Sequence, residues 1–221
     1  MSTQAALAAF DVDGTLIRGD SYLRYLVFVL VRRPSRWLRA PLLGVAVLLF
    51  AVGARSNTWL KTFFLRHVLA TLDPQREMNL TRAFVAILVR ERLKPGGVRR
   101  LREHRAAGDT VILLSAGLES YLTLLGGEVG ADAVLSTMVE RDAAGRITGR
   151  LHGENCYGPS KVERLQAFRS DRAAGERLYA YSDHASDLPL LLHADVPVAI
   201  DPDPLLRSAC ARLGIAVETW L

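Results

Sequence analysis

Short apolar runs alternate with longer stretches of helical periodicity along most of the chain. From about residue 95 onward, this alternation is the pattern of a parallel sheet with crossover helices. An earlier run, ALAAF at residues 6–10, has the apolar character of a short buried strand. We therefore expect an α/β fold with a parallel sheet. The expected strands are 6–10, 110–115, 177–182 and 196–200, and the expected helices are 97–108, 160–170, 186–194 and 204–214.

Two segments do not follow this alternation. Residues 136–153 contain two short β-type runs about a DAAGR turn, which predicts a hairpin beside the sheet. Residues 17–93 have helical periodicity and no convincing strands. We interpret this segment as an inserted helical cap, so that the core domain consists of residues 1–16 and 94–221.

The cap contains two unusually apolar stretches. Residues 40–54, APLLGVAVLLFAVGA, carry no charge and lie between Arg39 and Arg55. Residues 25–31 are bracketed by arginine in the same way. As a helix, the longer stretch spans about 22 Å, short of the roughly 30 Å hydrocarbon core of a bilayer. A transmembrane span is therefore disfavoured.

Positive charge is concentrated in the same segment. The formal net charge is +5, but residues 18–66 alone carry eight Arg and one Lys against a single acid, Asp20. The linker RRPSRWLR places four Arg and a Trp between the apolar stretches, which favours helices lying in an anionic membrane interface. The alternative is that these helices pack on each other or on a second copy, and the sequence predicts no oligomeric state. Nucleic-acid binding is not expected, because stretches this apolar make a poor surface for following phosphates.

Length and composition fit one catalytic core with an inserted subdomain. The two cysteines, Cys156 and Cys210, form neither a metal-binding pair nor a disulfide framework, which favours a reducing compartment. The start MSTQAALAAF has no basic region before its apolar residues, unlike a signal peptide. We expect a cytoplasmic protein, attached peripherally to the inner membrane face if the cap binds lipid.

Two acids close the first apolar run. Gly14 supplies the conformational freedom of a turn, so Asp11 and Asp13 lie at the C-terminal end of the first expected strand. Residues two apart on an extended segment point to the same side, and open α/β sheets place their ligands at this edge. Two like charges this close require a cation or a proton.

Other polar residues are expected at the same edge. Ser115 ends the second strand, and the small residues Ala116 and Gly117 leave backbone N–H groups accessible to an anion. Lys161 lies at a helix start, where its charge reaches an oxyanion. The remaining members are two acids that follow the strand at 177–182, Asp183 and Asp187.

This set suits phosphoryl transfer to a carboxylate. Mg²⁺ prefers oxygen ligands and keeps several waters, so a few carboxylates and a carbonyl suffice to hold it. Asp11 can attack phosphorus to give an aspartyl-phosphate, while Asp13 protonates the leaving oxygen and later takes a proton from the hydrolytic water. Residues 115–117, Lys161 and the metal hold the phosphoryl oxygens.

Four motifs, in order, resemble those of the haloacid dehalogenase superfamily of phosphohydrolases, subfamily IB, the phosphoserine-phosphatase-like group. The resemblance implies a Rossmann-like parallel sheet with a helical C1 cap inserted after the first strand. The second acid of the first motif argues against dehalogenase chemistry, and the DKTGT motif of P-type ATPases is absent. The matching stretches are DVDGTL at 11–16, LLSAG at 113–117, GPSK at 158–161 and YSDHASDLPLL at 181–191.

The resemblance also implies a role for each matching residue. Asp11 is the nucleophile and Asp13 the acid/base. The phosphate-binding residues are Ser115, with Ala116 and Gly117 beside it, and Lys161. The implied metal is Mg²⁺, held by Asp11, the backbone carbonyl of Asp13 and Asp183, with Asp187 orienting the groups around it.

The substrate stays open between two branches of this group. The apolar, basic cap resembles that of bacterial phosphatidylglycerophosphate phosphatases of the C type, which act on a lipid phosphate. Asp20, however, stands where phosphoserine phosphatases have a Glu near the substrate amine, and RGDS resembles the histidinol-phosphate type. Arg55 is our candidate for binding a substrate carboxylate, although Asp20 also suits a helix N-cap and Arg55 a membrane-surface or solvated charge. We expect a lipid phosphate, with a soluble amino phosphate as the alternative.

Overall fold

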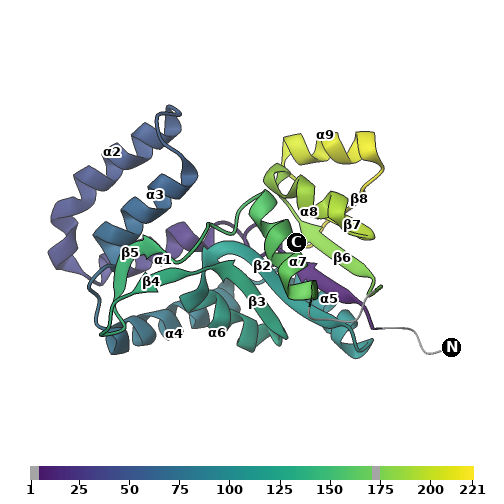
Figure 1. Ribbon diagram of the computed structural model, residues 1–221, viewed down its shortest axis with the longest axis horizontal. Coiled ribbons are helices and arrows are strands. Elements are labelled where there is room, and N and C mark those ends of the chain that lie inside the picture. Colours follow the sequence, from purple (N-terminus) through teal and green to yellow (C-terminus); the bar gives the residue numbers. More distant parts are fainter. Residues whose placement is uncertain (1–4, 171–174) are drawn as a thin grey trace.

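A six-stranded, entirely parallel sheet forms the centre of the protein in the computed structural model, which describes residues 5–170 and 175–221 (Figure 1). The α/β fold predicted from the sequence is confirmed. Residues 1–4 and 171–174, both within the predicted core segments, lie outside the described residues. In sheet order the strands are β3 (Ala133–Thr137), β2 (Thr110–Leu118), β1 (Leu7–Phe10), β6 (Leu178–Ser182), β7 (Val196–Ile200) and β8 (Ala216–Glu218).

Helices cover both faces of the sheet because both faces are apolar. Phe10, Leu113 and Tyr181 pack on one face together with residues of α5 (Pro95–Ala106) and α6 (Glu119–Val129). Successive strand residues point to opposite faces, so Ala9 and Ile112 pack on the other side. The helices on that side are α7 (Pro159–Ser170), α8 (Leu188–His193) and α9 (Pro204–Leu213).

Helices also make up the segment between β1 and α5. The chain leaves the core and returns to it side by side, because Arg18 N donates to Arg92 O at 2.8 Å and Lys94 N donates to Leu16 O at 2.9 Å. Helices α2 and α3 of this segment extend away from the sheet (Figure 1). Its elements are α1 (Ser21–Val31), the short 3-10 helix η1 (Pro34–Arg39), α2 (Ala40–Ala51), α3 (Asn57–Phe64), the π-helical turn η2 (Leu65–Leu69) and α4 (Pro74–Glu91).

The expected hairpin forms, but it packs on the cap. Strands β4 (Val139–Arg141) and β5 (Ile147–Leu151) pair antiparallel and form a sheet of their own. Thr71 N, just after η2, donates to Ile147 O at 3.1 Å, and Arg141 binds the buried Glu77 carboxylate of α4 with both terminal nitrogens. The hairpin therefore joins core and cap. 

Three elements are missing from our sequence-based expectation: β3, β8 and α6. β3 is partly exposed over its first three residues, and β8 is a three-residue edge strand with mostly exposed side chains. Neither has the continuous apolar run by which buried strands are recognised. The strand expected at 110–115 also runs on to Leu118 in the structure.

Candidate active site

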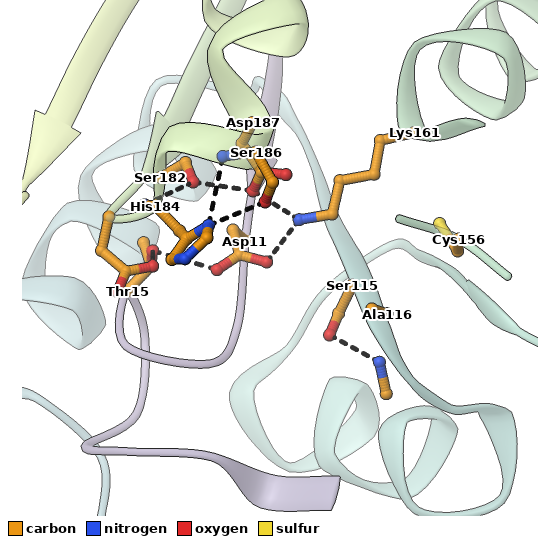
Figure 2. Close-up of polar contacts among 12 residues, drawn as sticks. Asp11, Thr15, Ser115, Ala116, Cys156, Lys161, Ser182, His184, Ser186 and Asp187 are labelled. Atoms are coloured by element: carbon orange, nitrogen blue, oxygen red, sulfur yellow. Dashed lines mark hydrogen bonds and ion pairs between the residues drawn. The ribbon is translucent and has the colours of Figure 1, made fainter. Parts of the chain in front are cut away.

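Asp11 and Lys161 form the centre of a buried polar cluster at the carboxyl end of β1. Phe10 pairs with Leu113 of β2 and Tyr181 of β6, so Asp11 lies level with the end of β6, while β2 continues beyond it to Leu118. Lys161 Nζ from α7 lies 2.6 Å from Asp11 Oδ1 (Figure 2). The sheet and α7 together therefore bring the predicted nucleophile and the predicted phosphate-binding lysine into direct contact.

A second carboxylate shares this lysine. Asp187 Oδ2 lies 2.5 Å from Lys161 Nζ and accepts a hydrogen bond from Ser182 Oγ at 2.7 Å. Burial alone disfavours the ammonium, but the carboxylates of Asp11 and Asp187 hold the pKa of Lys161 well above its usual range. Burial raises the pKa of Asp11, an effect that the Lys161 ammonium opposes. Lys161 is thus a permanently charged group.

Asp183 lies beside Asp11 and is connected to it by Thr15. The Thr15 hydroxyl is 3.1 Å from Asp11 Oδ2 and 3.1 Å from Asp183 Oδ1, so the two carboxylates converge. Burial, together with the nearby Asp11 charge, raises the pKa of Asp183 to about 7. Gly14 leaves the space for this approach, because a Cβ at that position would overlap the Asp183 carboxylate. Gly14 also has a φ of +76°, which favours glycine.

These residues fit a divalent cation. Two converging, desolvated carboxylates destabilise each other unless a positive charge lies between them. Within the described residues, no three His, Cys, Asp or Glu side chains form a metal site by themselves. The predicted set is instead two carboxylates and the backbone carbonyl of Asp13, oxygen ligands of the kind that Mg²⁺ takes together with water. Asp187 Oδ1 is buried and has no hydrogen-bond partner among the described residues, so it is available to a metal-bound water.

Asp13 has a different environment from Asp11. Its Oδ1 accepts a hydrogen bond from Ser21 N at 2.7 Å, at the start of α1. Burial raises the pKa of Asp13 to about 7, and the charge of Asp20 adds to the effect. A carboxyl group with this pKa holds a proton at neutral pH and releases it readily, as an acid/base group must.

The predicted phosphate-binding turn lies within the last residues of β2. Ser115 Oγ accepts a hydrogen bond from Gly117 N at 3.0 Å (Figure 2). The Ala116 carbonyl accepts hydrogen bonds from Thr137 Oγ1, at 2.9 Å, and from the ammonium of Lys61. Gly117 allows a close approach of α6, because a Cβ there would overlap the Tyr121 hydroxyl.

A cavity of about 550 Å³ connects these core residues with the cap. Asp20 lies in its lining and also caps α1, since its Oδ1 accepts a hydrogen bond from Leu23 N at 2.7 Å. Arg55 does not lie among the described lining residues; its guanidinium is 5.2 Å from the centre of the half-buried Trp59 ring. The assignment of Arg55 to substrate binding stays a prediction. The apolar wall consists of Leu23, Leu26, Val47, Phe50, Leu60 and Phe64.

Comparison with known proteins identifies the family. The model of the haloacid dehalogenase-like hydrolase family matches residues 8–192, a range that includes all four motifs. The chain is a haloacid dehalogenase-like hydrolase.

Relatives of this hydrolase include phosphatases. Histidinol-phosphatase of Neisseria meningitidis serogroup C is 27% identical, covering 94% of this chain and 96% of the relative. Phosphoserine phosphatase SerB1 of Mycobacterium tuberculosis is 26% identical, covering 97% of this chain and 71% of the relative. Protein CicA of Caulobacter vibrioides is 32% identical over 88% of this chain and 86% of its own length. The resemblance to the phosphoserine-phosphatase-like group is thus confirmed.

A solved structure shares the whole architecture. A protein of unknown function from Bordetella pertussis Tohama I has a TM-score of 0.88 and 27% identity, covering 99% of this chain and 100% of that one. The hydrolase is therefore an enzyme of this fold.

Sequence reasoning missed three residues of the site. Thr15 lies within the first motif, DVDGTL, so the sequence pattern could have identified it as a site residue. No sequence pattern identifies Lys61 and Asn155, because they lie in a cap helix and a loop that come together only in the folded chain. Lys61 was noted only for its charge.

Proposed function

We propose that this hydrolase is a Mg²⁺-dependent phosphomonoester phosphatase that forms an aspartyl-phosphate on Asp11. The observation that carries the proposal is the buried contact between Asp11 and Lys161, beside an Asp13 whose pKa lies near neutrality. Asp11 attacks phosphorus as the leaving oxygen departs, and the carboxyl group of Asp13 protonates that oxygen. Asp13 then takes a proton from the water that hydrolyses the intermediate.

The other residues of the site hold the phosphoryl group. Lys161 supplies a fixed positive charge, and the turn at 115–117 supplies a hydroxyl and backbone groups. Mg²⁺, when held by Asp11, Asp183 and the Asp13 carbonyl, supplies charge neutralisation for the phosphoryl oxygens. Thr15 keeps the Asp11 and Asp183 carboxylates side by side.

The proposed substrate is a lipid phosphate, such as phosphatidylglycerophosphate. Supporting this choice, six apolar side chains from α1, α2 and α3 line one wall of the cavity. Val47 and Phe50 of α2 belong to that wall, while Leu48 of the same helix is 62% exposed to solvent. One apolar helix thus forms both cavity wall and outer surface, as an enzyme acting on an amphiphile would require.

The proposed partner surface is an anionic membrane, contacted by the outer face of η1 and α2. Trp37, Leu38, Val45 and Leu48 are largely exposed there, and α2 carries no charged side chain. Basic residues surround this face, whereas the only acid within 18–66 is Asp20. Among the described residues, no helix has the length and apolar character needed to cross a bilayer. The proposed contact therefore lies in the interface, where apolar and basic side chains act together.

A soluble amino phosphate is the second candidate. Asp20 supports it, because its carboxylate lies in the cavity lining where it can meet a substrate ammonium. The Neisseria meningitidis relative named histidinol-phosphatase supports it as well.

The test is phosphate release, with Mg²⁺ and with EDTA, from phosphatidylglycerophosphate in mixed micelles, phosphoserine and histidinol phosphate. Asp11→Asn serves as the blank. A higher kcat/KM for the lipid supports the first candidate, and a preference for an amino phosphate supports the second. Mg²⁺-independent release, or full activity of Asp11→Asn, would overturn the proposed mechanism.

A further inference from the structure

Lys61 is a buried lysine that the cap inserts into the active site. It belongs to α3, yet it is only 5% exposed. Its ammonium donates to the carbonyl of Ala116, in the phosphate-binding turn, and to Asn155 Oδ1 at 2.6 Å. Lys61 is also part of the cavity lining. A cap residue is thus anchored directly to the core turn that carries Ser115.

Residues of both the core and the cap hold the Lys61 ammonium in position. Asn155 Oδ1 also accepts a hydrogen bond from Thr137 Oγ1 at 2.9 Å, and its Nδ2 donates to Asn57 Oδ1 of α3 at 3.2 Å. Thr137 Oγ1 is also 2.9 Å from the Ala116 carbonyl, so its one hydrogen alternates between these two acceptors. The position of the Lys61 ammonium is therefore determined by residues from β3, the loop before α7, and α3.

Among residues 5–170 and 175–221, no carboxylate lies within hydrogen-bond distance of the Lys61 ammonium. Both of its acceptors are neutral amide oxygens, whereas Lys161 is bonded to two carboxylates. An ammonium has three donors, and these acceptors use two of them. The Tyr22 ring centre is 5.2 Å from Nζ, and both side chains line the cavity from which a ligand would approach. Burying a cation with only neutral acceptors is costly unless an anion arrives to pair with it.

The charges around Lys61 indicate which part of a substrate it would meet. Asp13, Asp20 and Lys61 line the same cavity, where the Asp13 carboxylate favours the Lys61 ammonium most strongly and Lys161 repels it. Asp13 is the proposed donor to the leaving oxygen, so a cation beside it lies on the leaving-group side of the scissile bond.

We propose that Lys61 is a specificity-determining residue that binds an oxyanion of the leaving group. The enzyme would then prefer phosphomonoesters whose alcohol part carries a second anionic group, such as a phosphodiester or a carboxylate. The inference rests on the proposed phosphatase function, because it takes Asp13 to mark the leaving-group side. It adds a substrate class that includes phosphatidylglycerophosphate and excludes esters of neutral alcohols.

Two substrate pairs test this preference, each differing in one anionic group. The lipid pair is dihexanoyl phosphatidylglycerophosphate and dihexanoyl phosphatidic acid; the soluble pair is phosphoserine and phosphoethanolamine. Lys61→Met removes the charge at similar length, Lys61→Arg keeps it, and Arg82→Met is the control that removes an exposed cation of α4, outside the cavity lining. Thermal melts check that each variant is folded.

The expected result is a selective loss. Lys61→Met should lower kcat/KM for the anionic member of a pair by about ten- to hundredfold. The effect should appear mainly in KM, because losing a hydrogen bond to a charged group weakens binding by about that factor. The member that lacks the anionic group should change by less than about threefold, and Lys61→Arg should lose less than Lys61→Met. Equal losses for both members, or no loss for either, would overturn the inference.

A pH profile separates a charged contact from a structural role. Burial lowers the pKa of Lys61 to about 8, so the ratio of kcat/KM for the anionic member to kcat/KM for the other member should fall above that pH, whereas titration of Asp13 affects both members alike. The fall should disappear in Lys61→Arg, whose guanidinium stays charged. A fall that persists in that variant would contradict the assignment.

Failure of the proposed function gives a different result. In that case the wild type releases no phosphate from any of the four compounds with Mg²⁺. Calorimetric binding of the same compounds to Asp11→Asn, with and without Lys61→Met, then still decides the role of Lys61. Tighter binding of the anionic member that depends on Lys61 supports it, and equal binding contradicts it.

Discussion

The Lys161 ammonium lies 2.6 Å from the Asp11 carboxylate, although 150 positions separate the two residues in the chain. The parallel sheet places Asp11 at the end of its central strand, and α7 brings Lys161 over that end. The contact keeps Lys161 charged in a buried site and gives Asp11 a neighbouring cation. It is the arrangement on which the proposed nucleophilic step depends.

Removing this cation should be costly to the folded state. In Lys161→Met the buried carboxylates of Asp11 and Asp187 lose their shared partner, and we expect a stability loss of about 3–5 kcal/mol near neutral pH. Urea unfolding measures it. The double variant Lys161→Met/Asp187→Asn should recover part of the loss, because it removes one of the two unpaired charges. Unchanged stability of Lys161→Met would contradict the importance of the pair.

Gly14 should be intolerant of a side chain for two separable reasons. Gly14 and Gly53 have nearly the same φ, +76° and +75°, but a Cβ would overlap Asp183 only at Gly14 and would meet nothing within 4 Å at Gly53. Gly53→Ala should therefore cost only the backbone strain, about 1–2 kcal/mol. Gly14→Ala should cost more and should weaken Mg²⁺-dependent turnover by displacing Asp183. Thermal unfolding and Mg²⁺ titrations of activity compare the two. Equal effects would show that the contact with Asp183 is unimportant.

The pH dependence of the first step should follow Asp13. Burial and the Asp20 charge raise the pKa of Asp13 to about 7, and only the protonated form can donate to the leaving oxygen. Single-turnover rates should therefore fall as the pH rises above 7. Asp20→Asn removes the charge while keeping a residue that caps α1 well, so the fall should begin at a lower pH. Glu128→Gln, on the exposed surface of α6, is the control. A profile that is the same in all three proteins would contradict the role of Asp13.

The outer face of α2 should determine membrane binding. Val45 and Leu48 are 53% and 62% exposed, so replacing both with Asp should weaken binding to phosphatidylglycerol vesicles by at least about tenfold. Leu205→Asp, on α9 of the core, introduces the same chemistry away from the cap and should have no effect. Cosedimentation in the Asp11→Asn background separates binding from turnover. Equal binding of all variants would contradict the membrane contact and would indicate that α2 packs on other helices or on a second copy of the chain.

The central strands and the catalytic motifs could be predicted because their signals are local. Buried parallel strands are short apolar runs, and the acids that follow β1 and β6 stand directly after such runs. The outer strands β3 and β8 could not be predicted, because their apolar runs, 133–135 and 215–217, are only three residues long. The helical content of the cap was visible for the same local reason.

The specificity residues could not be predicted because they depend on how the cap packs on the core. Lys61 enters the site only because α3 lies against the loop that carries Asn155. Arg55 lies two residues before α3, and its guanidinium contacts the Trp59 ring outside the described cavity lining. A one-dimensional pattern contains no information on which of these two cations faces the substrate.

The most direct test of the account is to locate the phosphoryl group on the enzyme. Enzyme mixed with substrate and Mg²⁺, quenched in acid during turnover and digested, is analysed by mass spectrometry. The account predicts a phosphorylated peptide containing Asp11, absent from the Asp11→Asn variant. A phosphoryl group on another residue, or none while phosphate is released steadily, would contradict it.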